Sequence, residues 1–310
     1  MTVSTFELAA ADEAHRAESI IQRERVAIDL AGAELAAMPL MNPATLPAVS
    51  IFRIRYESEG IPVSGFLFFP PTEGPHPAVI FNRGGFGEFG MLRPDLAFLQ
   101  LADLAAEGFV VAASQYRGTG GAPGRDEFGG ADVADVLALI DVLDGMEEVD
   151  PERIGMMGHS RGGMMTWLAL ARTGRIKAAA ILAGPTDLPG GLVARPEMME
   201  VYSRAISADR ARVIAGLEER SALRFADALP RETPILLIHG TADWRVSPTD
   251  SLRMAEQLLD LRIPFRLVLL EGAEHGFSEH RLEVQRMVRD WFARFLAEDP
   301  ELPEVSPHGP

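Results

Sequence analysis

Short, nearly continuous runs of hydrophobic residues recur from the middle of this chain to its C-terminal part. Each run is bounded by Gly, Pro or polar residues and is shorter than a buried helix would be. Runs of this kind are typical of strands that are covered on both faces, as in a parallel sheet. We predict such strands at residues 77–82, 108–115, 153–159, 178–184, 234–240 and 265–272.

Segments with helical periodicity fall between most of these runs. This alternation predicts an α/β fold, in which a mostly parallel central sheet carries helices on both faces. Ahead of it, side chains in residues 50–70 alternate in polarity around Glu59-Gly60, which predicts an antiparallel hairpin. The predicted helices span residues 95–107, 131–143, 162–172, 249–261 and 280–297.

The N-terminal part of the chain has a different pattern. Residues 6–38 space Leu, Ile, Val and Ala among charged residues as a helix does, and Pro39, Pro43 and Pro47 then break the pattern. We therefore predict a helical arm and a linker over residues 1–48. The arm could pack on the main domain or on a second subunit, so a homodimer is one expectation.

The remaining chain divides into a main domain, an insertion and a tail. We predict that the main domain spans residues 49–298. Within it, residues 186–231 are too long for one crossover and contain helix-like stretches, which predicts a cap-like helical insertion over the sheet. Residues 299–310 are rich in proline and are predicted to form a flexible tail.

The charge and composition narrow the classes of partner. The net charge of −16 would repel phosphate backbones and anionic lipid heads, so we expect neither nucleic acid nor a membrane as partner. The absence of cysteine from the sequence excludes disulfides and cysteine nucleophiles. The N-terminus lacks the pattern of a signal peptide, and no stretch approaches the length of a membrane-spanning helix, so we expect a cytoplasmic protein.

Residues 158–162 form a Gly-x-Ser-x-Gly pentapeptide where a predicted strand ends and a predicted helix begins. A sharp turn at such a corner holds the serine in a strained conformation, and the flanking glycines let the two backbones pass. The Ser160 hydroxyl would stand above the carboxyl end of the sheet, beside the positive end of a helix dipole. We predict that Ser160 is a catalytic nucleophile.

A serine hydroxyl needs a general base, and the base needs an acid that orients it. For a nucleophile at this kind of corner, the acid and then the histidine follow along the chain. Asp243 follows the predicted strand at 234–240, and His275 follows the one at 265–272. Because parallel strands end at the same edge of a sheet, we predict that Ser160, Asp243 and His275 form a catalytic triad.

Two of these residues also have structural interpretations. Asp243 could cap the helix predicted at 249–261, and His275 could be a turn histidine that its neighbours satisfy. No other acid or histidine fits the loop positions as well. The nearest substitutes are the acids Asp250 and Glu274 and the histidines His159, His239 and His280.

Acyl transfer also requires donors for the oxyanion of the tetrahedral intermediate. The backbone N–H of Arg161, directly after the nucleophile, is the first predicted donor. The second should come from the Gly-rich loop at residues 83–87, where we favour Gly85 over Gly84. A phosphate-binding role for this loop has little support, because the chain has no G-x-x-x-x-G-K-[ST] motif.

Four segments together resemble a known family. They are GHSRGG, HGTADWRVSP, EGAEHGF and QYRGTGGAPGRDEFGGADVADV. They are similar to the catalytic domain of the prolyl oligopeptidase family of serine peptidases and its related esterases, which belong to the α/β-hydrolase superfamily. The resemblance covers residues 50–297. It implies that Ser160, Asp243 and His275 match the nucleophile, acid and base of that family.

The chain also departs from this family. Large members carry a β-propeller, for which 310 residues leave no room. Arg83 stands where some members have a tyrosine or histidine before the paired glycines. We also identify no acidic pair of the kind that some dipeptidases use to bind a free amino terminus. These departures favour an esterase or a small-amide hydrolase over a peptidase.

We therefore predict a serine hydrolase that cleaves an ester or amide bond of a small substrate or short peptide through an acyl-enzyme, without a metal or organic cofactor. A carboxylesterase-like activity is favoured. The alternatives are a prolyl-oligopeptidase-like aminopeptidase or acylaminoacyl peptidase and, from a different class, a non-catalytic binding protein on a hydrolase fold. The candidate substrate-binding residues are Arg83, Phe86, Trp244, Met198 and Tyr202.

Overall fold

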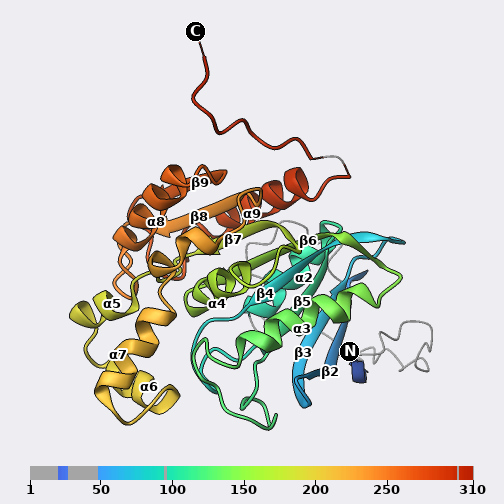
Figure 1. Ribbon diagram of the computed structural model, residues 1–310. Helices are drawn as coiled ribbons and strands as arrows, with labels where there is room; N and C mark the ends of the chain where they lie inside the picture. The colour runs from blue at the N-terminus through green and yellow to red at the C-terminus, as the bar shows by residue number, and fades with distance from the viewer. Residues whose placement is uncertain (1–19, 27–47, 94–95, 299, 310) are drawn as a thin grey trace.

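The computed structural model describes residues 20–26, 48–93, 96–298 and 300–309 (Figure 1). In these residues the strands form a single mixed sheet in the order β1-β2-β3-β5-β4-β6-β7-β8-β9. The strands are β1 Ile20–Arg25, β2 Ser50–Ser58, β3 Ile61–Phe69, β4 His76–Asn82, β5 Val110–Ser114, β6 Val149–His159, β7 Ile176–Leu182, β8 Ile235–Gly240 and β9 Phe265–Leu270.

The predicted division of the sheet is confirmed. Strands β2 and β3 form the antiparallel hairpin, and β4 to β9 all run parallel to their neighbours within that group. The prediction that every parallel strand is buried on both faces is wrong for β9. It lies at the edge of the sheet, where most of its side chains are partly or fully exposed, because a strand with one neighbour has less cover.

Helices cover both faces of the sheet, as predicted. Helices α3 Val133–Asp144, α4 Arg161–Leu170 and α8 Pro248–Asp260 bury their apolar side chains in one core cluster. Helices α2 Leu96–Ala106 and α9 Arg281–Phe295 bury theirs in a second cluster on the opposite face. Two layers of helices therefore enclose the sheet (Figure 1).

The predicted N-terminal helix is wrong at residues 20–25. These residues form β1, which pairs antiparallel with β2, and the guanidinium of Arg23 lies 3.7 Å from the centre of the Phe52 ring. Pairing with a neighbouring strand satisfies the backbone groups of this segment and outweighs its helical pattern. The rest of the predicted arm, residues 1–19 and 27–47, lies outside the described residues.

The predicted insertion at residues 186–231 is helical. It contains α5 Leu188–Ala194, α6 Met198–Ala205, α7 Arg210–Glu219 and two short 3₁₀ helices, η2 Ala222–Arg224 and η3 Ala226–Ala228. In Figure 1 these helices gather at one end of the domain. The role of the insertion as a cap stays a prediction. Residues 300–309 form no helix or strand and extend away from the domain. In the described part of the chain, no helix combines the length and apolar character needed to cross a membrane.

Candidate active site

The corner between β6 and α4 holds Ser160 in an unusual backbone conformation, with φ of 58° and ψ of −128°. A side chain at Gly158 would collide with the carbonyl group of Gly162, and one at Gly162 would collide with the carbonyl group of Asn82. Glycine is therefore required on both sides of the serine, as predicted from the pentapeptide. The Ser160 N–H donates to the carbonyl oxygen of Leu182 on the neighbouring β7, which anchors the strained turn to the sheet.

The three residues predicted as a triad form a row, in which His275 lies within hydrogen-bonding distance of both Ser160 and Asp243. Nε2 of His275 is 2.8 Å from Oγ of Ser160, and Nδ1 of His275 is 2.7 Å from Oδ2 of Asp243. Because the carboxylate accepts from Nδ1–H, Nε2 is left free to accept the serine proton. This is the arrangement in which an imidazole acts as a general base.

Asp243 lies in a pocket of donors that keeps it ionised. Its Oδ1 accepts from the backbone N–H groups of Arg245 and Val246, at 2.8 and 3.0 Å. Burial alone would raise the pKa of Asp243, but hydrogen bonds from His239 and His275 outweigh burial and hold that pKa well below its usual range. Asp243 is therefore held as an anion beside Nδ1 of His275.

His239 lies next to Asp243, and the sequence interpretation gave this histidine only a structural role. Its Nε2 lies 3.1 Å from the carbonyl oxygen of Val246 and 3.3 Å from Oδ2 of Asp243, and its Nδ1 lies 2.7 Å from Oγ of Ser251. Two acceptors at Nε2 require the proton there, so Nδ1 accepts from the serine hydroxyl. Its place at the end of a strand, four residues before Asp243, was the available signal.

The alternative acids are engaged elsewhere. Asp250 accepts from the N–H groups of Thr186 and Asp187 and so anchors the start of the insertion. Glu274 accepts from the N–H groups of Gly276 and Ser278 and so shapes the loop that carries His275.

The alternative bases are also engaged. Nε2 of His159 lies 2.7 Å from the carbonyl oxygen of His275, and its ring centre is 4.8 Å from that of His275. Burial and the nearby His275 lower the pKa of His159 to about 4, so its ring is neutral at pH 7. His280 lies beside Glu283, three residues later in α9.

The Gly-rich loop after β4 passes next to the nucleophile. A side chain at Gly84 would point to within 3.9 Å of the Ser160 hydroxyl, and Gly85 has a φ of 76° that favours glycine. Arg161 is the first residue of α4, so its N–H has no acceptor inside the helix and points out of the helix end. The two segments predicted to form the oxyanion hole therefore meet at Ser160.

Arg83 has a different place from the predicted one. Its side chain is 1% exposed, and it donates to the carbonyl oxygens of Gln115, Gly84 and Gly87. These bonds occupy the guanidinium inside the protein, so the prediction that Arg83 contacts substrate is wrong. Arg83 instead holds the Gly-rich loop in place through its backbone carbonyl groups. The sequence did not reveal this role, because Gln115, which accepts two of these hydrogen bonds, lies 32 residues away along the chain.

A buried set of charges, which we call the arginine cluster, joins this loop to the nucleophile corner. It consists of Arg83, Asp126, Asp132 and Arg161. Nη1 of Arg161 donates to Oδ2 of Asp126 and to the carbonyl oxygen of Gly85, both at 2.8 Å. Asp126 in turn accepts from the N–H of Gly87 at 2.9 Å. Arg83, Arg161 and Asp126 therefore hold the two segments of the predicted oxyanion hole at fixed positions relative to each other.

The other predicted substrate-binding residues lie in two places. Phe86 and Tyr202 both lie near Phe128, with ring centres 6.2 and 5.2 Å from it, which forms a row of aromatic rings from the Gly-rich loop to the insertion. Tyr202 is buried in this row, and Met198 is partly buried against the same core cluster. Trp244, next to Asp243, is 65% exposed.

Two arginines flank the exposed Trp244. The guanidinium of Arg195 lies 5.3 Å from the centre of its ring, and that of Arg245 lies 5.1 Å from it. Arg195 comes from the insertion, so this group joins the insertion to the loop that carries the acid. Among the described residues, no group of three or more His, Asp or Glu side chains is arranged to hold a metal ion.

Comparison with protein families identifies the chain at this point. Residues 96–299 match the model of the prolyl oligopeptidase family. The chain belongs to this family. It is a serine hydrolase with an α/β-hydrolase fold, as the resemblance of its motifs implied.

Individual relatives differ in how much of their length the chain covers. It is 29% identical to the uncharacterized peptidase YtmA of Bacillus subtilis, over 80% of this chain and 95% of that protein. It is 28% identical to the human acylamino-acid-releasing enzyme, over 69% of this chain but 30% of that enzyme. Among solved structures, a Mycobacterium tuberculosis puromycin-hydrolyzing peptidase matches with a TM-score of 0.74 and 27% identity, over 86% of this chain and 42% of that one.

Proposed function

We propose that this serine hydrolase is a peptidase that releases a blocked amino acid from the N-terminus of a short peptide, with Ser160, His275 and Asp243 as its catalytic triad. The observation that carries the proposal is the continuous hydrogen-bonded row from Ser160 Oγ through His275 to Asp243. The relatives favour this peptidase interpretation over the carboxylesterase that the sequence departures favoured, since named peptidases and acylamino-acid-releasing enzymes are among them.

The proposed reaction proceeds through an acyl-enzyme. His275 Nε2 takes the proton of Ser160 as Oγ attacks the carbonyl carbon of the scissile amide, and the imidazolium is held by Asp243. The N–H groups of Arg161 and Gly85 stabilise the oxyanion. His275 then gives its proton to the leaving amine as the C–N bond breaks. A water molecule, deprotonated by the same His275, attacks the acyl carbon, and the bond to Ser160 Oγ breaks as Oγ takes the proton back from His275.

The charges around the site favour a blocked substrate over one with a free amino group. An α-ammonium group needs a carboxylate partner, but Asp126 and Asp132 are already paired with Arg161, and Glu274 is bound to its own loop. The exposed Trp244 lies between two guanidinium groups. That of Arg195 is paired with Glu197, whereas that of Arg245 forms no ion pair with a described residue and repels a cation. An acetyl or formyl group on the substrate nitrogen removes the charge and with it this cost.

The first test is to label the protein with a fluorophosphonate probe. The wild type should be labelled, Ser160→Ala should not, and His275→Ala should react much more slowly, because a serine without its base is a poor nucleophile. A folded Ser160→Ala protein that is labelled as fast as the wild type would place the nucleophile elsewhere and refute the proposed triad.

The second test separates the substrate classes with one leaving group. N-acetyl-alanine p-nitroanilide and alanine p-nitroanilide differ only in the acetyl group, and p-nitrophenyl acetate reports esterase activity. We expect kcat/KM for the acetylated anilide to exceed that for the free amine by about tenfold or more, the ratio that one uncompensated charge produces. Equal values, or hydrolysis of the ester alone, would contradict the proposed specificity while leaving the triad intact.

A further inference from the structure

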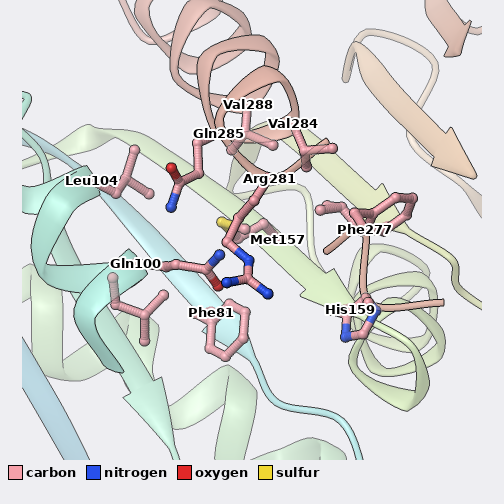
Figure 2. Close-up of a pocket in the computed structure, with 13 residues that line it drawn as sticks. Phe81, Gln100, Leu104, Met157, His159, Phe277, Arg281, Val284, Gln285 and Val288 are labelled. Carbon is pink, nitrogen blue, oxygen red and sulfur yellow. The ribbon is translucent and has the colours of Figure 1, made fainter. Parts of the chain in front are cut away.

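A cavity of about 140 Å³ lies between α2 and α9, on one face of the sheet (Figure 2). Its volume is close to that of an engineered protein cavity of about 150 Å³ that binds benzene. The cavity therefore has room for an apolar group of about the size of one aromatic ring. Its apolar lining residues are Phe81, Leu101, Leu104, Met157, Leu182, Phe277, Val284 and Val288.

Polar groups of α9 enter this apolar cavity without partners. Among the described residues, Nε of Arg281 and both side-chain amide atoms of Gln285 are buried and have no hydrogen-bond partner. Figure 2 shows the Arg281 side chain reaching from α9 toward Gln100 on α2. Buried donors and acceptors without partners are costly, so natural proteins rarely leave them unless something else supplies the partner.

The charge of the cavity selects the kind of partner. Arg281 forms no ion pair with any described residue, and none of the residues that line the cavity is acidic. With a net charge of −16, the protein as a whole repels anions, so the half-buried Arg281 guanidinium without an ion-pair partner in the cavity wall is a local exception. A carboxylate is the group that a guanidinium fork binds best.

The cavity is next to the proposed triad but separate from it. His159 and Gly276, which precede and follow Ser160 and His275 in the sequence, line the cavity, whereas Ser160, Asp243 and His275 do not. His159 also contacts the backbone of His275 through its Nε2. A ligand in the cavity would therefore touch the supports of the triad without occupying the site of the reaction.

We propose that this cavity binds a small carboxylic acid whose apolar body is about the size of a benzene ring. The carboxylate pairs with the Arg281 guanidinium and accepts a hydrogen bond from the Gln285 amide, and the apolar body fills the space between α2 and α9. The site does not depend on the activity proposed above, because none of its contacts is made by the triad.

Two fluorinated probes test the proposal by ¹⁹F NMR titration of the Ser160→Ala protein, which cannot turn over a substrate. The probes are 4-fluorobenzoate and the neutral 4-fluorobenzamide. We expect the benzoate to bind about tenfold more tightly than the amide, since a charge-assisted hydrogen bond contributes at least that factor. Equal binding of the two probes, or no binding of the benzoate, would overturn the proposal.

Variants of α9 locate the binding. Arg281→Gln should weaken benzoate binding about tenfold, and Val284→Phe, which fills the cavity, should abolish it. Arg286→Gln is the matched control, because Arg286 is exposed on the same helix and does not line the cavity, and it should leave the affinity unchanged. Benzoate binding that persists in both Arg281→Gln and Val284→Phe would show that the probe binds elsewhere and would refute the site.

Discussion

Two buried carboxylates, Asp243 and Asp126, lie at the same edge of the sheet and have different surroundings. Asp243 is held by backbone N–H groups and by two histidines. Asp126 is held by the guanidinium of Arg161, with Arg83 close by, together with backbone N–H groups. The pKa of each is lowered against the effect of burial, but the partners that lower it differ.

This difference separates Asp243, whose neighbour His275 can carry a proton, from Asp126, whose neighbours have fixed charges. A histidine can gain and lose a proton near neutral pH, so the charge beside Asp243 can change during a reaction. An arginine keeps its charge at any physiological pH, so the charges around Asp126 are fixed. Asp243 is thus arranged to respond to a proton that moves on His275, whereas Asp126 is arranged to hold the Gly-rich loop and the nucleophile corner still.

The largest expected effect is on the Asp243 side. Asp243→Asn should lower kcat by a factor on the order of 10⁴, because the amide no longer selects the tautomer of His275 with a proton on Nδ1. The free energy of unfolding in urea should change less than the activation free energy does, because the amide fills the same space as the carboxylate. The measurement is kcat on the preferred anilide substrate.

Asp250→Asn is the matched control for that change. Asp250 is also buried and close in sequence, but it binds the N–H groups at the start of the insertion. Its kcat should fall less than about tenfold, since an amide oxygen can still accept from one of those groups. If the two variants lost activity equally, Asp243 would not be the distinct acid of the triad.

The next effect belongs to the arginine cluster. Asp126→Asn leaves Arg161 with less compensation in a buried site, so the protein should lose about 3–5 kcal/mol of its free energy of unfolding. Activity should fall by a factor of up to about 10² even where the variant is fully folded, because the oxyanion donors lose their register. Urea unfolding and kcat at low temperature measure the two effects.

The exposed Asp141 on α3 provides the control for a lost carboxylate. Asp141→Asn should change neither stability nor kcat measurably, since surface substitutions have small effects. A folded Asp126→Asn protein with the kcat of the wild type would mean that the cluster stabilises the fold but does not position the oxyanion hole.

The same contrast explains what the sequence could predict. Ser160, Asp243 and His275 could be placed because each follows a strand, and parallel strands end at one edge of the sheet. The role of Arg83 could not be predicted, because its acceptors at Gln115 and Thr119 come from another loop. A charged residue beside glycines has the sequence signature of an exposed loop, and only the folded chain shows that it is covered.

The predictions for residues 20–25 and for the edge strand β9 were wrong for a related reason. Residues 20–25 have too few apolar positions to distinguish a strand from a helix, and their pairing with β2 decides the outcome. In β9 the apolar run is nearly continuous, yet none of the described strands follows it in the sheet order. Local patterns thus predict which segments are strands better than they predict the neighbours of each strand.

The smallest effect concerns His159, the histidine that supports the base. Its pKa is about 4 in the folded protein, mainly because the ring is buried, against an ordinary value of 6.5. Above pH 6.5 the ring is neutral in both the folded and the unfolded chain, so it does not affect stability there. As the pH falls from 6.5 to 4, the unfolded chain takes up the proton first, and the folded state loses stability progressively. His159→Gln keeps a donor near the His275 carbonyl but cannot be protonated, so it should remove about 3 kcal/mol of this acid-dependent loss. Urea unfolding of both proteins between pH 7 and pH 4 measures the difference, and parallel curves would mean that His159 keeps an ordinary pKa in the folded protein.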